Sequence, residues 1–211
     1  MPIVTVSREY GSGGYVFGRS LAARIGADFA DASLVEEVAR RMRCPAEVVE
    51  RWDERSESLI LRLLRAMQSA NPESVSPGPI ASGVYVDAPS PERVAATVRE
   101  VVLEEARSGN AVIVGRGGAF VLRDHATALH VRLVASRSDR LGRIAERYSL
   151  SLEDAGDRVD EADRERARYI KHNFGLEWRD PANYDIVFNT SRVPIEDAVE
   201  ATFRILERRT A

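Results

Sequence analysis

A glycine-rich segment lies between the first apolar run of the chain and the first helical pattern. Residues 3–7 are mostly β-branched and apolar, which favours a short strand, and Gly11, Gly13 and Gly14 follow shortly afterwards. Apolar residues then recur on one face of a helix that is expected to end at Gly26. Glycines let backbone N–H groups converge, and a helix N-terminus carries partial positive charge, so this unit predicts a cradle for phosphate. A tight strand-to-helix turn without a ligand would give the same pattern.

The alternation of strand and helix patterns continues along the chain. Apolar runs of strand length lie near Phe29 and at 111–114, 129–135 and 186–189, and helical patterns lie at 33–69, 91–108, 137–173 and after Pro194. The segment 70–90 is rich in Pro, Ser and Gly and is expected to be a mobile surface loop. Strands that alternate with helices predict an α/β fold with a parallel sheet covered on both faces, in three layers.

Composition limits the class of protein. The chain has 211 residues, of which 44% are hydrophobic, enough for the core of one domain. Its net charge of -3 gives no bulk attraction to nucleic acid or to an anionic membrane. No apolar stretch reaches the roughly 18 residues of a membrane helix, no signal-peptide pattern opens the sequence, and the single cysteine, Cys44, cannot form an internal disulfide. We therefore expect a cytoplasmic protein that binds neither nucleic acid nor membranes.

The Walker phosphate-loop pattern, G-x-x-x-x-G-K-[ST], fits the glycine segment incompletely in two registers. Counted from Gly13, it places Arg19 at the lysine position, inside the expected helix. Counted from Arg8, it places Gly14 at the lysine position and Tyr15 at the hydroxyl position. The second register is favoured because the loop must follow the strand immediately. Since the chain has a single lysine, at position 171, arginines must supply the cationic contacts with any phosphate.

Several segments in the same order resemble the cytidylate kinase-like branch of the P-loop nucleoside monophosphate kinases. They cover nearly the whole chain except 70–90, and are residues 3–14, 18–22, 29–31, 112–117, 133–136, 160–166 and 178–190. The resemblance implies a P-loop NTPase-like parallel sheet with a helical acceptor-binding arm and a lid, all in one domain over 1–211. The core would comprise 1–32, 109–136 and 174–211, the arm 33–108 and the lid 137–173.

The resemblance also implies roles for individual residues. In cytidylate kinases the segment that matches 114–117 reads Asp-Gly-Arg-Asp and its arginine binds the acceptor phosphate, which implies that role for Arg116. The expected acceptor-binding residues are Asp31, Arg116, Asp160, Asp163 and Arg166, with Asp163 near the sugar or base and Arg166 near the phosphates. The expected donor-phosphate residues are Arg8, Gly11, Ser12, Gly13, Gly14 and Arg19. The expected catalytic residues are Arg116, Arg166, Arg137 and Arg140.

Other interpretations of these charged residues stay open. The helix carrying Asp160, Asp163 and Arg166 would also fit a solvated stripe of salt bridges, because its members are spaced by three residues. The arginines at 137, 140, 143 and 147 could close on the donor as lid arginines or form a solvent-facing row.

The sequence departs from the family pattern at four positions. Gly14 replaces the loop lysine, Tyr15 the hydroxyl residue, Val114 the acid at the end of the strand, and Gly117 the second acid of the cytidylate motif. Magnesium would then depend on Glu9, on Asp31, on Ser12 or mostly on water, and the selection of cytosine loses one carboxylate.

Together these features predict an ATP-dependent kinase that uses Mg²⁺ to phosphorylate CMP or dCMP. Its partners would be small-molecule nucleotides. The alternatives are a kinase of the same fold that acts on another small acceptor, and a nucleotide-binding regulator in which catalysis is lost or weak.

Overall fold

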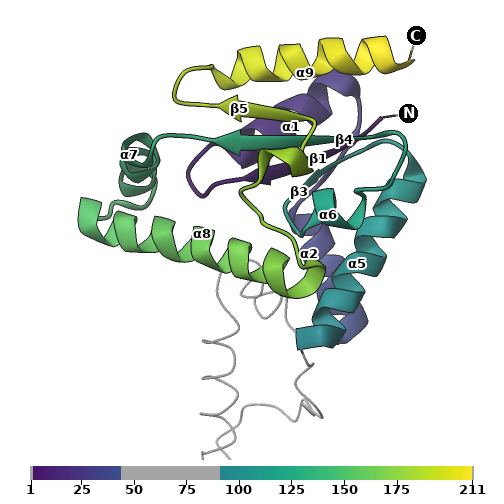
Figure 1. The fold of residues 1–211 in the computed structure, drawn as a ribbon, viewed down its shortest axis with the longest axis horizontal. Helices are drawn as coiled ribbons and strands as arrows, with labels where there is room; N and C mark the ends of the chain where they lie inside the picture. Colours follow the sequence, from purple (N-terminus) through teal and green to yellow (C-terminus); the bar gives the residue numbers. More distant parts are fainter. Residues whose placement is uncertain (1, 44–90, 211) are drawn as a thin grey trace, which may run out of the picture.

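The computed structural model describes residues 2–43 and 91–210 of the chain (Figure 1). The helical patterns expected between 44 and 69 and the loop expected at 70–90 lie outside the described residues. Within the two described ranges, no helix has both the length and the apolar character needed to cross a membrane.

The described strands form one parallel sheet in the order β2-β3-β1-β4-β5, as the sequence predicts. They are β1 (Ile3–Arg8), β2 (Asp28–Ala30), β3 (Ala111–Val114), β4 (Ala128–Val134) and β5 (Ile186–Asn189). The central strand β1 pairs with β3 on one side and with β4 on the other. The segments that follow β1 and β3 therefore leave the same edge of the sheet side by side. In open α/β sheets, ligand crevices form at such a place.

Helices cover both faces of the sheet, which gives the expected three layers (Figure 1). On one face, α1 (Gly14–Ile25) and α9 (Ile195–Thr210) enclose a cluster that includes Val4, Val6 and Leu129. On the other face, α2 (Ala32–Met42) and α5 (Pro91–Ser108) pack on Ile3 and Ile113. The two ends of the expected arm, 33–108, are therefore part of the cover of the sheet.

A further cluster, built around aromatic side chains, completes the face that carries α2 and α5. It lies between α8 (Leu152–Phe174) and a short helix, α6 (Gly118–Val121), which the sequence did not predict. Phe120, Ile170, Trp178 and Tyr184 are buried there. This cluster fixes the end of α8 against the sheet.

The charged segment expected to be helical over 137–173 consists of two helices, α7 (Arg137–Tyr148) and α8. The break lies at Ser149, whose left-handed φ of 53° ends α7. Ser151 then begins α8 by accepting a hydrogen bond from the backbone N–H of Asp154 at 3.0 Å. As Figure 1 shows, α7 follows the carboxyl end of β4, and α8 runs back from it below the sheet.

Candidate active site

The glycine loop, residues 9–13, joins β1 to α1 and is anchored to β4. Ser12 is fully buried, and its hydroxyl donates to the backbone oxygens of Glu9 at 2.8 Å and Leu133 at 3.2 Å. Gly11 and Gly13 have φ values of 83° and 87°, a region that side chains disfavour. The helix that follows carries no acidic residue in its first turn, so nothing there offsets the partial positive charge of its N-terminus.

A cavity of about 330 Å³ opens beside this loop. Loop residues, the end of β3 and parts of α2, α7 and α8 line it. Eight of the expected site residues meet in its wall: Arg8, Glu9, Gly11, Gly13, Gly14, Asp31, Arg116 and Arg166. With Arg147, the lining holds four arginines against two carboxylates. An excess of planar guanidinium groups suits a ligand with several phosphate charges.

Arg116 lies in a tight turn directly after β3. Gly118 donates its backbone N–H to the Gly115 oxygen at 2.8 Å, and Arg116 and Gly117 between them both have positive φ, 52° and 66°. These angles belong to a type I′ turn. A non-glycine residue held at positive φ stores about 1–3 kcal/mol of strain, which is frequent at functional sites. The turn therefore presents Arg116 to the cavity in a fixed, strained position.

Gly117 occupies the position where cytidylate kinases carry the second acid of the motif. A Cβ at this glycine would lie 3.1 Å from a ring atom of Phe174 and 3.2 Å from one of Tyr169. A side chain at 117 would thus be tight against the aromatic residues at the end of α8, which would have to shift slightly.

Asp163 and Arg140 lie beneath the glycine loop and do not line the cavity. Asp163 is 2% exposed; its carboxylate accepts the Tyr10 N–H at 2.8 Å and binds the Arg140 guanidinium at 2.6 Å. Arg140 also donates to the Tyr10 oxygen at 3.2 Å and lies 3.5 Å from the carboxylate of Glu9. In this arrangement the pair braces the loop. Asp163 was expected near the sugar or base of the acceptor, but in the structure it contacts Tyr10 and Arg140.

Arg166 lies one turn further along α8 and reaches the cavity. Its Nη1 donates to the backbone oxygen of Arg8 at 3.0 Å, and its guanidinium lies 5.5 Å from the centre of the Tyr10 ring. Arg166 therefore combines a fixed backbone contact with a place in the cavity wall.

Arg137 and Asp160 pair with each other at the surface, away from the cavity lining. Arg137 donates two hydrogen bonds to the Asp160 carboxylate, at 2.7 and 3.1 Å. These bonds hold the pKa of the Asp160 carboxyl below its usual value. The stripe expected along α8 is thus split: Asp160 forms a surface salt bridge, while Asp163 and Arg166 are buried. Arg19 lies exposed on α1, also outside the lining.

The arginines along α7 make different contacts in the structure. Arg147 lines the cavity, whereas Arg143 donates to the Gly11 oxygen at 3.3 Å and to the Thr190 oxygen at 2.8 Å. Arg143 thereby ties the loop to the end of β5. Helical spacing alone could not distinguish these tasks, because they depend on where the loop passes each turn of α7.

An aromatic part of the cavity wall was missed by the sequence reasoning. Tyr10, Tyr148 and Ile144 line the cavity, and the Arg158 guanidinium lies 4.1 Å above the Tyr148 ring. Such a wall suits a flat, apolar group such as a nucleobase. The available signal was the position of Tyr10 inside the loop and the four-residue spacing of Ile144 and Tyr148 on α7.

Comparison with known proteins gives a family match and several curated relatives. A family model described as the cytidylate kinase-like family matches residues 3–192. The chain is 33% identical to the cytidylate kinase of Pyrobaculum arsenaticum over 103 residues, 49% of this chain and 55% of that protein. It is 33% identical to the cytidylate kinase of Ignicoccus hospitalis over 111 residues, 52% of this chain and 63% of that protein. The chain thus matches somewhat more than half the length of these relatives.

Solved structures share the fold over almost the whole chain. An uncharacterized protein from Eubacterium ventriosum has a TM-score of 0.69 at 17% identity, covering 98% of this chain and 99% of its own. The shikimate kinase from Bacteroides thetaiotaomicron has a TM-score of 0.54 at 16% identity, covering 98% of both chains. The predicted fold, a parallel sheet between two layers of helices like that of the P-loop kinases, is confirmed.

Proposed function

The chain belongs to the cytidylate kinase-like family, and from this premise we propose that it is an ATP-dependent nucleoside monophosphate kinase that phosphorylates CMP or dCMP. The observation that carries the proposal is the cavity, in which the glycine loop and the Arg116 turn face the same space. An anion cradle and a fixed arginine that follow the neighbouring strands β1 and β3 suit the alignment of two phosphates for transfer.

In this proposal the donor phosphates lie over the loop glycines at the start of α1, and the acceptor phosphate lies between Arg116 and Arg166. An oxygen of the acceptor phosphate attacks the γ-phosphorus of ATP, a new oxygen–phosphorus bond forms, and the bond to the ADP oxygen breaks. Phosphoryl transfer passes through a loose, in-line transition state, so positioning and positive charge supply most of the catalysis. The arginines provide both, with no covalent intermediate on the protein.

The cavity residues fit a magnesium ion that arrives with the nucleotide. Mg²⁺ is commonly held by one or two carboxylates together with substrate phosphates and water, and Glu9 and Asp31 are the carboxylates of the lining. Glu9 is partly engaged, since its carboxylate accepts the Ala135 N–H at 3.2 Å. In the part of the chain that the structure describes, no group of three metal-ligating side chains lies together. When bound, the ion would neutralise charge on the donor phosphates.

One observation favours a second candidate, a kinase of the same fold with a different small acceptor. The position of the second acid is Gly117, and aromatic rings of α8 fill the space beside it. A carboxylate that would help to select cytosine is therefore missing, and the acceptor base has to be chosen by other residues.

Turnover assays separate the candidates. Purified protein with ATP and Mg²⁺ is offered CMP, dCMP, UMP and AMP in turn, and ADP release is measured. CMP- or dCMP-dependent release supports the proposal, whereas release with another acceptor only supports the second candidate. If no acceptor raises ADP release while ATP still increases the melting temperature, the protein is a nucleotide binder without this activity.

Arg116→Gly is the matched variant for this assay. Glycine tolerates the positive φ of the turn, so the fold should be kept while the acceptor contact is lost. Acceptor-dependent turnover should fall by about two orders of magnitude or more. A large fall in the melting temperature instead would identify Arg116 as a structural residue.

A further inference from the structure

The side chain of Arg8 occupies the space that a side chain at position 14 would need. A Cβ placed on Gly14 would lie 2.5 Å from Cγ of Arg8 and 2.7 Å from its Cβ. Carbon atoms do not approach so closely, and the obstacle includes the rigid base of the arginine side chain. A side chain at 14 and an arginine at 8 are therefore mutually exclusive in this backbone.

The guanidinium of Arg8 lies against Gly115 in the turn after β3. A Cβ on Gly115 would overlap Nη1 of Arg8 and lie 2.7 Å from Cζ. The absence of a side chain at both glycines leaves room for the arginine, along its stem at Gly14 and at its charged end at Gly115. Arg8, Gly14 and Arg116 are all in the cavity wall, so the charged end of Arg8 is carried to the side where Arg116 is held.

In the register that begins at residue 8, the Walker pattern has glycine at position 8 and lysine at position 14. This chain has the reverse arrangement, a cation at 8 and a glycine at 14. We propose that Arg8 replaces the Walker lysine as the cation that binds the donor phosphate chain, and that Gly14 is glycine to let Arg8 pass. This assignment rests on the proposed function. It gives the binding of the donor phosphates to one residue, although several arginines could have shared that role.

The base of Arg8 is held well enough for this task. Arg8 is the last residue of β1, and its register partner on β4 is Leu133. Its backbone oxygen accepts a hydrogen bond from Arg166 at 3.0 Å, and the next residue, Glu9, donates its N–H to the Leu133 oxygen at 3.0 Å. A side chain that leaves a fixed strand end loses less freedom on binding than a surface arginine would. A planar guanidinium can also bind two phosphate oxygens at once.

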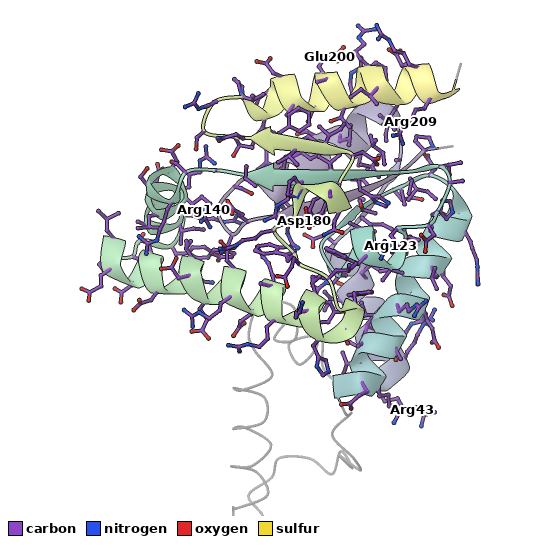
Figure 2. All side chains as sticks on the ribbon, in the orientation of Figure 1. Arg43, Arg123, Arg140, Asp180, Glu200 and Arg209 are labelled. Carbon is purple, nitrogen blue, oxygen red and sulfur yellow. The ribbon has the colours of Figure 1, made fainter. Side chains whose placement is uncertain are left out.

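The binding test uses inorganic tripolyphosphate, which has the charge and chain of the donor without the nucleoside. Arg8→Gln keeps the side-chain stem that packs over Gly14 and removes the charge, so the fold should be preserved. Its tripolyphosphate affinity, measured by calorimetry, should be weaker by about tenfold or more, the usual effect of losing a charged hydrogen-bonding group. The control, Arg123→Ala, removes an exposed arginine that is outside the cavity lining and lies to the right of Arg140 in Figure 2, and it should bind like the wild type.

Exchanging the two residues tests the shared volume. Gly14→Lys alone should lower the melting temperature, because the new side chain overlaps Arg8. The double variant Arg8→Gly with Gly14→Lys recreates the Walker residues, and it should recover both the melting temperature and most of the tripolyphosphate affinity. Circular dichroism of every variant verifies the fold.

Three results would overturn the assignment of Arg8: wild-type affinity in Arg8→Gln, no recovery in a folded double variant, or no tripolyphosphate binding by the wild type. Failure of the proposed function looks different. In that case ATP and CMP give no ADP, while tripolyphosphate affinity still follows the cation from position 8 to position 14.

Discussion

Asp163 and Arg140 form a buried ion pair, 2.6 Å between Oδ2 and Nη1, and both also bind the backbone of Tyr10 in the glycine loop. Through this pair α7 and α8 are fastened to the loop. Arg140 lies on the inner side of α7, toward the carboxyl end of the sheet (Figure 2). The shape of the loop thus depends on two side chains that do not touch the cavity.

Removing one partner of this pair should cost more stability than removing both. Asp163→Leu leaves the buried Arg140 guanidinium without its partner at 2.6 Å, with only the Glu9 carboxylate 3.5 Å away, and such a change costs about 3–5 kcal/mol of unfolding free energy. Replacing both, as in Asp163→Leu with Arg140→Met, should cost less than either Asp163→Leu or Arg140→Met alone. Urea unfolding of the four proteins measures the coupling, and strictly additive losses would contradict a direct ion pair.

The surface pair of Arg137 and Asp160 is the matched control for that cycle. It joins the same two helices with a similar bond length, 2.7 Å, but both side chains are about half exposed. Exposed pairs contribute little to stability because water and salt screen them. Asp160→Asn should therefore change the urea midpoint far less than Asp163→Asn, and a loss of similar size would mean that burial is not the cause.

Gly117→Asp restores the acid of the cytidylate motif and should destabilise the protein. The new side chain meets Phe174 and Tyr169 at a positive φ, so we expect a loss of about 1–3 kcal/mol. Gly175→Asp is the control, since Gly175 has a similar φ of 70° but open space where a Cβ would be. A smaller loss at 175 than at 117 isolates the packing effect; equal losses would show that only the backbone conformation matters.

Ser12→Ala should lower the free energy of unfolding and leave the magnesium dependence of turnover unchanged. The buried hydroxyl is used in holding the loop to Leu133 and Glu9. Its removal leaves buried carbonyl oxygens with fewer donors, which costs about 1–3 kcal/mol. Chemical unfolding measures the loss, and ADP release is titrated with MgCl₂. A raised magnesium requirement in the folded variant would return Ser12 to the role of a metal ligand.

The fold could be predicted because local patterns specify it. A parallel sheet with a phosphate-type loop follows from local features, which are the apolar runs at β1, β3 and β4 and the glycines after β1. The break at Ser149 and the helix α6 escaped prediction because each is a single turn of backbone, below what periodicity can detect.

The sequence predicted which types of residue form the site, but only partly which role each residue has. Arg116 and Arg166 were expected to bind the acceptor and lie in the cavity wall. Asp163 was expected to bind the acceptor and Arg140 to be catalytic, and both lie beneath the loop. Helical spacing places residues on a face, but contacts with the loop decide which of them reach the cavity. The aromatic wall of Tyr10 and Tyr148 brings together residues far apart in the sequence, which no local pattern reports.

His130 should make the protein less stable as the pH falls below about 6.5. It lies on β4 with 8% of its surface exposed, and its Nδ1 is 2.8 Å from the Thr5 hydroxyl. Burial lowers the pKa of His130 below its usual value, so between the two pKa values the unfolded chain binds more protons than the folded one. Stability therefore falls as the pH drops through this range, by at most about 1.4 kcal/mol per pH unit.

Urea unfolding at pH 7.5 and 5.5 measures this dependence in the wild type and in His130→Asn, whose amide can still bond Thr5 but does not titrate. The variant should lose less stability between the two pH values than the wild type does. His172→Asn, which replaces an exposed histidine of α8, should keep the wild-type dependence. The same pH dependence in His130→Asn as in the wild type would show that groups other than His130 take up the proton.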